Sequence, residues 1–202
     1  MSLSVNRARL ALLLIDVQPG FFPAAAGELE PVLQRIEHLL PLASAFDVPT
    51  IATFEHPVDE KGWLPERLER VFPANGQRML KRTFNCCGEP DIRSAIAALD
   101  RPQIAVAGAE TDVCVLQSVL ALLELGYHVF LLEDCLFTSE PNDGPAIARM
   151  RQAGAIPTTY KALYYELRQS VASPAPWRAW NERYAGGGFV APEELRVVRT
   201  RG

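Results

Sequence analysis

Two residues of this chain combine a reactive side chain with a position at which active sites form. Asp16 directly follows the apolar run Leu10–Ile15, and Cys114 comes five residues after the apolar run Gln103–Ala109. In doubly wound sheets, ligands bind beyond the carboxyl ends of the strands, where the strand order reverses. If these runs are such strands, the carboxylate and the thiol are candidates for chemistry.

The setting of Cys114 favours a nucleophile. If Thr111 is the N-cap of the helix that follows, Cys114 occupies its third position, within the turn whose N–H groups have no internal partner. The positive end of the helix dipole would stabilise a thiolate and lower the pKa of Cys114 below the free value of about 8.5. The same N–H groups could hold an oxyanion.

The same residue types also have structural roles. A lone cysteine is commonly a small buried apolar residue, and an aspartate at the end of a strand is commonly a turn or capping residue. Lys81 follows an apolar pair and precedes Arg82, and its default role is that of a solvated cation. Position alone leaves both kinds of role open for all three residues.

Neither the histidines nor the cysteines form a metal-binding pattern. The histidines are scattered along the chain, and no two cysteines have the CxxC spacing. The residues concerned are His38, His56, His128, Cys86, Cys87, Cys114 and Cys135. We therefore expect no metal and no other cofactor, and a cytoplasmic protein with reduced thiols.

Short apolar runs alternate along the chain with stretches of helical periodicity. The expected strands are Leu10–Ile15, Pro49–Glu55, Gln77–Lys81, Gln103–Ala109, Tyr127–Leu132 and Ala155–Tyr160. The expected helices are Glu30–Phe46, Asp91–Leu99, Asp112–Leu125, Ala146–Ala153 and Ala162–Ser170. Strands that are apolar throughout and alternate with helices indicate a parallel sheet covered on both faces. The predicted fold is α/β: a three-layer α/β/α sandwich with a mainly parallel, doubly wound sheet.

The composition is that of an ordinary globular domain. The chain has 202 residues, of which 49% are hydrophobic and 22% charged, and this fits a single domain over residues 1–202. We expect a core over about residues 8–170 and a C-terminal arm over residues 171–202, where prolines, glycines and isolated aromatic residues gather. A net charge of −4 provides no basic face for nucleic acid. The N-terminal apolar run is too short for a membrane span and lacks a signal-peptide cleavage site.

Several segments resemble the isochorismatase-like cysteine hydrolases. Ala105–Val115 (AVAGAETDVCV) resembles the nucleophile signature of that family, and Leu12–Phe22 (LLLIDVQPGFF) resembles its first strand with the catalytic aspartate. Leu80–Cys87 (LKRTFNCC) resembles the segment that carries its lysine. Gly126–Cys135 and Arg149–Leu167 match later parts, so the resemblance covers roughly residues 8–170 in the family's order.

The resemblance implies a fold and a set of site residues. It implies an isochorismatase-like, Rossmann-like fold in which Cys114 is the nucleophile, Asp16 its acid–base partner and Lys81 their electrostatic support. Arg82 competes with Lys81 for the cation position, because the match there could slip by one residue. The oxyanion hole would consist of the backbone N–H groups of Glu110 and Cys114, beside a cis peptide bond between Ala109 and Glu110.

Departures from two branches of the family narrow the expected reaction. The nicotinamidase branch binds a metal through an Asp-x-His pair, but the matching stretch here is Phe54-Glu55-His56, which again predicts no metal. True isochorismatases act without the cysteine nucleophile. The resemblance therefore implies cleavage of an amide-type C–N bond in a small molecule, through a thioester on Cys114. Three aromatic residues near the expected strand ends are predicted to wall the substrate pocket: Phe21, Phe22 and Phe84.

A non-catalytic binding or assembly module of the same fold is the main alternative, and a thiol redox protein that uses Cys114 with Cys135 or Cys86 is a weaker one, because it lacks a CxxC motif. The expected helix Asp112–Leu125 is apolar nearly all round, so it must be covered on every side. We therefore predict a homo-oligomer, a dimer or larger.

Overall fold

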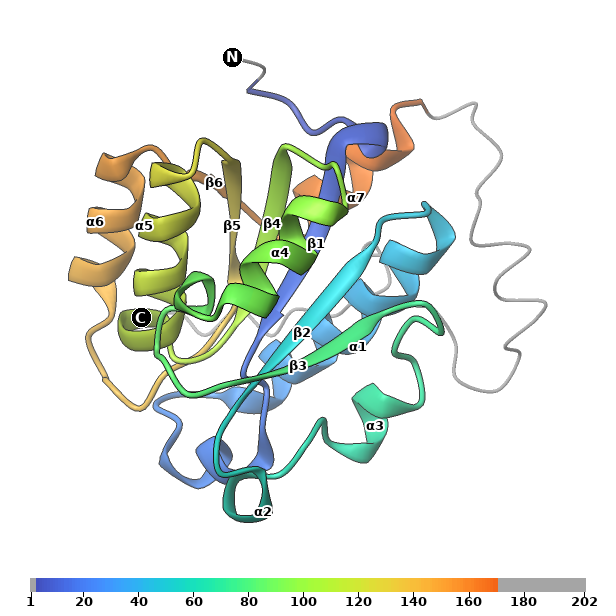
Figure 1. Ribbon diagram of the computed structural model, residues 1–202. Coiled ribbons are helices and arrows are strands. Elements are labelled where there is room, and N and C mark those ends of the chain that lie inside the picture. Colours follow the sequence, from blue (N-terminus) through green and yellow to red (C-terminus); the bar gives the residue numbers. More distant parts are fainter. Residues whose placement is uncertain (1–2, 171–202) are drawn as a thin grey trace.

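The computed structural model describes residues 3–170, and within them one parallel sheet forms the centre of the molecule (Figure 1). Its strands are β1 (Leu10–Ile15), β2 (Thr50–Glu55), β3 (Gln77–Lys81), β4 (Gln103–Gly108), β5 (His128–Leu136) and β6 (Ile156–Thr158). They lie in the order β3-β2-β1-β4-β5-β6, and every neighbouring pair is parallel. The predicted C-terminal arm, residues 171–202, lies outside the described residues.

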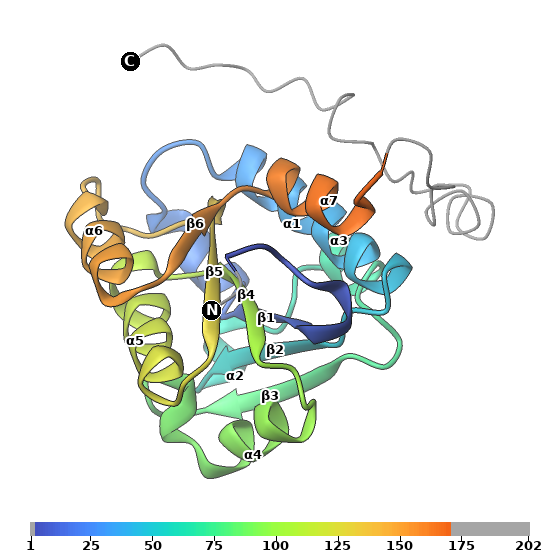
Figure 2. The ribbon, with the colours of Figure 1, turned by 90° about the horizontal axis from the view of Figure 1, so that it is seen from above.

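Helices cover both faces of this sheet (Figure 2). On one face lie α1 (Leu29–Ala45), the short α3 (Glu66–Glu69) and α7 (Tyr160–Arg168), and on the other lie α4 (Pro90–Ala98), α5 (Leu116–Glu124) and α6 (Gly144–Ala153). A further short helix, α2 (Val58–Lys61), lies at the carboxyl end of the strands, at the bottom of Figure 1. The predicted three-layer α/β/α sandwich is confirmed.

The strand β1 shows why its sequence is apolar throughout. All six of its residues are buried. Because successive side chains of a strand point to opposite faces, Leu12 and Leu14 join the core beneath α1 and α7, whereas Leu13 and Ile15 join the core beneath α4, α5 and α6. Burial of both faces accounts for the wholly apolar sequence of β1, and the first polar residue after it is Asp16.

The order of the strands places a switch point beside Asp16. The chain builds β1 to β3 outward in one direction and then returns to build β4 to β6 in the other, so β1 and β4 are neighbours. Asp16 has a positive φ of 49° at this point, and Gly108 at the end of β4 has a φ of 120°. A Cβ atom on Gly108 would lie 2.0 Å from the carbonyl oxygen of Ile15, so this approach requires glycine.

The structure corrects the expected start of the helix that carries Cys114. The segment does not begin as a regular α-helix with Thr111 as its cap: residues Thr111–Val115 form a π-helical turn that Glu110 precedes, and α5 continues from Leu116. Cys114 is the fourth residue of that turn, not the third, and the Thr111 side chain is buried. None of the described helices is long and apolar enough to cross a membrane.

Candidate functional site

The three predicted catalytic side chains meet at the carboxyl ends of the strands. Asp16 follows β1, Lys81 is the last residue of β3, and Cys114 lies in the turn after β4. The Lys81 ammonium lies 2.6 Å from Asp16 Oδ2 and donates a hydrogen bond to Cys114 Sγ at 3.3 Å. The side chains of Asp16 and Lys81 are both fully buried.

The alternative cation, Arg82, does not enter this cluster. Its side chain is exposed, and its backbone N–H donates to Glu89 Oε1 at 2.6 Å. Lys81 is the last residue of β3 and pairs in register with Glu55 of β2, whereas Arg82 lies in the bend that follows the strand. Of these two candidates, Lys81 is therefore the one that lies in the cluster.

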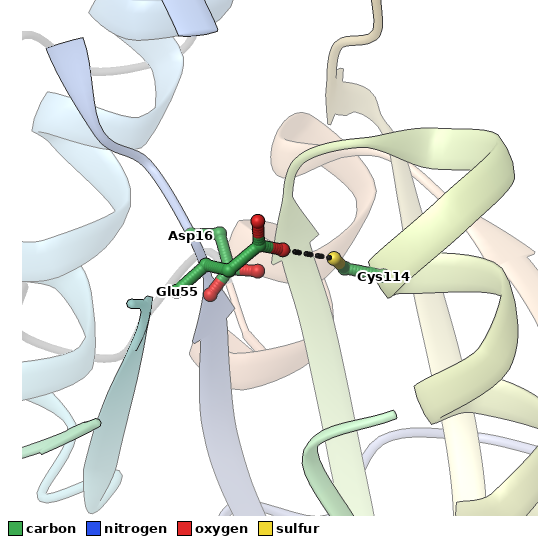
Figure 3. Close-up of side chains that lie close together, drawn as sticks. All are labelled: Asp16, Glu55 and Cys114. Carbon is green, nitrogen blue, oxygen red and sulfur yellow. Dashed lines mark hydrogen bonds between the residues drawn. The ribbon is translucent and has the colours of Figure 1, made fainter. Parts of the chain in front are cut away.

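The sequence reasoning missed Glu55, which joins the cluster as a second carboxylate. The Cys114 thiol donates to Glu55 Oε2 at 3.3 Å, and the Lys81 ammonium lies 3.5 Å from the same oxygen. Lys61 of α2 pairs with the other oxygen, Oε1. Figure 3 shows Asp16, Glu55 and Cys114 pointing toward one another. Glu55 ends a strand just as Asp16 follows one, and that signal could have identified it.

Two further polar residues hold the carboxylates in place. Thr53 of β2 donates its hydroxyl to Asp16 Oδ1 at 2.9 Å. Gln18 is fully buried: its side-chain amide donates to the carbonyls of Glu55 at 3.2 Å and Gly62 at 2.7 Å, and its oxygen accepts from the Glu55 N–H at 2.7 Å. The backbone that carries Glu55 is thereby fixed from both sides.

The electrostatics of the cluster overturn the expected low pKa of the thiol. Burial is the largest effect and, together with the charge of Asp16, it raises the pKa of Cys114 well above its ordinary value, although Lys81 acts in the opposite direction. Burial also raises the pKa of Asp16 despite the neighbouring Lys81. The raised pKa of Cys114 favours the thiol form, so a nucleophilic thiolate would require a base to remove its proton.

Burial and the neighbouring charges act in opposite directions on the pKa values of Lys81 and Glu55. Burial acts to lower the pKa of Lys81, but the charge of Asp16 and its hydrogen bond with Lys81 outweigh burial and raise this pKa, so Lys81 is protonated. For Glu55, burial acts to raise the pKa, but hydrogen bonds from Lys61 and Cys114 and the charge of Lys81 outweigh it and lower the pKa.

The cluster has metal-ligating atoms but does not fit a metal. The donor atoms of Asp16, Glu55 and Cys114 all lie within 4.8 Å of one another. The Lys81 ammonium already contacts all three, at 2.6, 3.5 and 3.3 Å, and so holds the place a cation would take. In the stretch where a metal pair would be expected, Phe54 is buried against Trp63, with ring centroids 5.0 Å apart, and His56 is exposed.

The turn that precedes Cys114 is anchored by the segment after β5. The peptide bond between Ala109 and Glu110 is cis, and the Glu110 side chain accepts a hydrogen bond from the Ser139 N–H at 3.0 Å. The Thr111 N–H donates to the Phe137 carbonyl at 3.1 Å, and the Asp112 side chain accepts from the Thr138 hydroxyl. The Glu110 side chain is thereby bound to the segment after β5, and its carboxylate has no proton to donate, so only its backbone N–H could stabilise an oxyanion.

The three predicted pocket aromatics occupy different surroundings. Phe21 is half-buried, and its ring lies 5.7 Å from the Lys61 ammonium, next to Glu55. Phe22 is half-buried and packs edge-on against Phe137, with centroids 5.9 Å apart. Phe84 is 54% exposed. Phe21 therefore contacts the cluster through Lys61, and the pocket role of all three residues remains a prediction.

The comparisons with known proteins agree with this architecture. The family model "Isochorismatase domain" matches residues 10–162. The Escherichia coli protein "Probable hydrolase YcaC" is 30% identical over 162 residues, which span 79% of this chain and 77% of that protein. The solved YcaC from Escherichia coli, described as an octameric hydrolase of unknown specificity, has a TM-score of 0.79 at 27% identity and covers 89% of this chain and 86% of its own.

Two other solved structures are similar. YcaC from Pseudomonas aeruginosa, solved with hexane-2,5-diol and covalent acrylamide, has a TM-score of 0.78 at 28% identity and covers 87% of this chain and 85% of its own. A structure of MAR1 ribonuclease from Caenorhabditis elegans has a TM-score of 0.81 at 24% identity, covering 98% of this chain and 100% of its own, and it shares the fold.

Proposed function

The chain belongs to the isochorismatase family and is a hydrolase, and on this premise we propose that it is a cysteine hydrolase that cleaves an amide-type C–N bond in a small molecule. The observation that carries the proposal is the Lys81 ammonium, which contacts both Asp16 and Cys114 inside a buried cluster. A carboxylate, an ammonium and a thiol in mutual contact supply a base, a counter-charge and a nucleophile. A non-catalytic binding module would have no use for this arrangement.

The first step removes the proton of the Cys114 thiol. Because burial raises the pKa of Asp16, its carboxylate is a stronger base than an exposed one. Asp16 accepts the thiol proton as Sγ attacks the carbonyl carbon, and the electron pair of the C=O bond moves onto oxygen. Lys81 stabilises the charge that develops on sulfur, since its ammonium lies 3.3 Å from Sγ.

The next steps release the amine and then the acid. The tetrahedral oxyanion is held by the backbone N–H groups of Glu110 and Cys114, and each such donor typically contributes 10²–10³-fold to the rate. Asp16 returns its proton to the nitrogen as the C–N bond breaks, which leaves a thioester on Cys114. Asp16 then takes a proton from water, the water oxygen attacks the thioester, and the acid departs as the thiol re-forms.

Substitution of the nucleophile and of the base tests this proposal. Cys114→Ser and Asp16→Asn are expected to lose turnover on amides that the wild type hydrolyses, by 10²–10⁴-fold for the base. Asp59→Asn is the matched control, because Asp59 is an exposed residue of α2. Mass spectrometry of the wild type during turnover is expected to show an acyl adduct on Cys114. A folded Cys114→Ser protein with wild-type turnover would refute the proposal.

We also propose that the protein assembles into a homo-oligomer. Helix α5 is apolar on most sides: Leu116, Val119 and Leu122 are buried, while Leu125 at its end is 49% exposed. The solved YcaC from Escherichia coli, which shares this fold, is octameric. Light scattering at micromolar concentration is expected to give a multiple of the monomer mass, and a monomer mass would contradict the proposal.

A further inference from the structure

We infer that Glu55 is a further catalytic residue, which selects substrates whose scissile group carries an N–H donor. The inference rests on the proposed function, and it concerns the same site. Glu55 contacts the reacting sulfur directly, because the Cys114 thiol donates to its Oε2 at 3.3 Å. Its role differs from that of Asp16, as the partners of the two carboxylates show.

In the resting site, Glu55 accepts a hydrogen bond from the thiol, and Asp16 is the second carboxylate within hydrogen-bonding reach of it. Both oxygens of Asp16 face other donors: Oδ1 accepts from the Thr53 hydroxyl at 2.9 Å, and Oδ2 faces the Lys81 ammonium at 2.6 Å. Glu55 Oε2 has the thiol at 3.3 Å and Lys81 at the longer distance of 3.5 Å. The thiol is therefore the nearer donor of this oxygen.

The proton nevertheless leaves the thiol for Asp16, because the two carboxylates differ as bases. Burial raises the pKa of Asp16 despite Lys81, whereas hydrogen bonds from Lys61 and Cys114 outweigh the burial of Glu55 and lower its pKa. A proton shared among these groups goes to the stronger base. Glu55 thus remains a carboxylate when the thiolate forms.

Loss of the thiol hydrogen leaves Glu55 in need of a new donor. Its Oε2 then faces a negative sulfur at 3.3 Å, with only the more distant Lys81 in compensation. Its side chain is 14% exposed, so water reaches it poorly. A substrate N–H placed between Glu55 and the reacting carbon would replace the lost donor. Primary and secondary amides carry such a group, whereas esters and tertiary amides do not.

Glu55 cannot easily turn away to find another partner. Lys61 holds its second oxygen, and the buried Gln18 holds its backbone N–H at 2.7 Å and its carbonyl at 3.2 Å. A fixed acceptor that is left without a donor weakens binding of the wrong substrate, which is how buried polar groups produce specificity. This preorganisation is why the discrimination is assigned to Glu55.

Two probes of nearly identical shape test the inference. N-Methylchloroacetamide has an N–H where methyl chloroacetate has an ester oxygen, and both alkylate thiols. In each reaction the Sγ–C bond forms at the CH₂ carbon, the C–Cl bond breaks, chloride leaves with the bonding pair, and the thiol proton passes to Asp16. The rate at Cys114 is followed by peptide mass spectrometry, with Cys114→Ser as the blank. The ratio of the amide rate to the ester rate at Cys114 is divided by the same ratio measured with glutathione. This division corrects for the different intrinsic reactivities of the two probes toward a thiol.

The variants are Glu55→Met, which removes the acceptor, and Glu55→Gln, which keeps an acceptor oxygen without the charge. Glu60→Met is the matched control, since Glu60 is an exposed residue of α2. In the wild type and in Glu60→Met, the normalised ratio is expected to be about 10 or more, the factor that one hydrogen bond to a charged group contributes. It is expected to fall to about 1 in Glu55→Met and to an intermediate value in Glu55→Gln.

A wild-type ratio near 1, or a wild-type ratio retained in folded Glu55→Met, would overturn the inference. If Glu55→Met does not fold, a wild-type ratio in Glu55→Gln overturns it equally. Absence of alkylation at Cys114 in the folded wild type would also overturn it, because the probes then do not reach the sulfur that Glu55 contacts. A Glu55-dependent ratio without hydrolysis of any amide would refute only the proposed hydrolysis, so the two failures are distinguishable.

Discussion

Replacing Lys81 by methionine is expected to destabilise the fold strongly, because this ammonium is buried among three partners. Lys81→Met keeps the length and apolar stem of the side chain but removes the charge 2.6 Å from Asp16 and 3.5 Å from Glu55. Asp16 is fully buried and keeps no cation beside it, although the Thr53 hydroxyl still donates to Oδ1 at 2.9 Å and the Cys114 thiol lies within hydrogen-bonding reach. Removal of one partner of a buried ion pair typically costs about 3–5 kcal/mol.

The loss is measurable as a change in melting temperature and in urea denaturation. For a chain of this size, 1 kcal/mol corresponds to about 2–4 °C, so a melting temperature lower by about 6–20 °C is expected. Lys161→Met is the matched control, because Lys161 is exposed on α7, and it is expected to change stability by less than about 0.5 kcal/mol. The double variant Lys81→Met/Asp16→Asn, which leaves neither charge stranded, is expected to recover part of the loss.

The loss is also expected to depend on pH. In the wild type, burial already raises the pKa of Asp16 although Lys81 lowers it, so removal of Lys81 raises this pKa further. A carboxyl group whose pKa is raised on folding adds stability below its unfolded pKa and loses that contribution as pH rises through the folded pKa. The deficit of Lys81→Met should therefore be smaller at pH 5 than at pH 8. A deficit below about 1 kcal/mol at pH 8 would refute the assignment of Lys81 as the buried counter-ion.

Three further predictions follow from the geometry. Because Lys81 holds the cation position, chelators are expected to leave hydrolysis unchanged, and stoichiometric metal that is needed for activity would contradict this. Gly108→Ala is expected to lower the free energy of unfolding by at least about 3 kcal/mol, because its Cβ would lie 2.0 Å from a carbonyl oxygen. Gly126 is the control, since it also has a positive φ but nothing lies within 4 Å of the Cβ position. Gly126→Ala should cost about 1 kcal/mol in the same urea titration. Resting Cys114 is expected to react with iodoacetamide at pH 7 more slowly than free cysteine and faster as pH rises, since burial raises its pKa; a faster reaction than free cysteine would contradict a resting thiol.

The strands were the part of the fold that could be predicted best, because strands buried on both faces of a parallel sheet are largely apolar. The apolar run Leu10–Ile15 and the more polar stretch Gln77–Lys81 were both assigned their observed bounds from the sequence pattern. The strand expected at Tyr127–Leu132 instead spans His128–Leu136, where its alignment with β4 shifts between Val106 and Gly108. Such an irregularity depends on the neighbouring strand, which a single sequence does not reveal.

Site residues that follow an apolar run could be predicted from the sequence. The one that reaches the site through the pairing of neighbouring strands was missed. Asp16 and Cys114 stand out because each follows an apolar run. Glu55 was read only as the middle of a stretch that lacks metal ligands, although it pairs in register with Lys81. The low pKa expected for Cys114 was wrong because a dipole argument ignores burial and the charge of Asp16, which dominate here. Burial depth is a property of the packed fold.

The arrangement of the site along the chain has a consequence for how this protein can be recombined. Every group that handles a proton or a counter-charge, from Asp16 to Lys81, comes from the half of the sheet built by β1 to β3, whereas Cys114 and its turn come from the half that begins with β4. The two halves meet along the β1–β4 ladder, from the Leu10–Gln103 pair to the Ile15–Gly108 pair. A chimaera joined between β3 and β4 would inherit its acid–base chemistry from one parent and its nucleophile from the other, and the fit of that one ladder would decide whether the two work together.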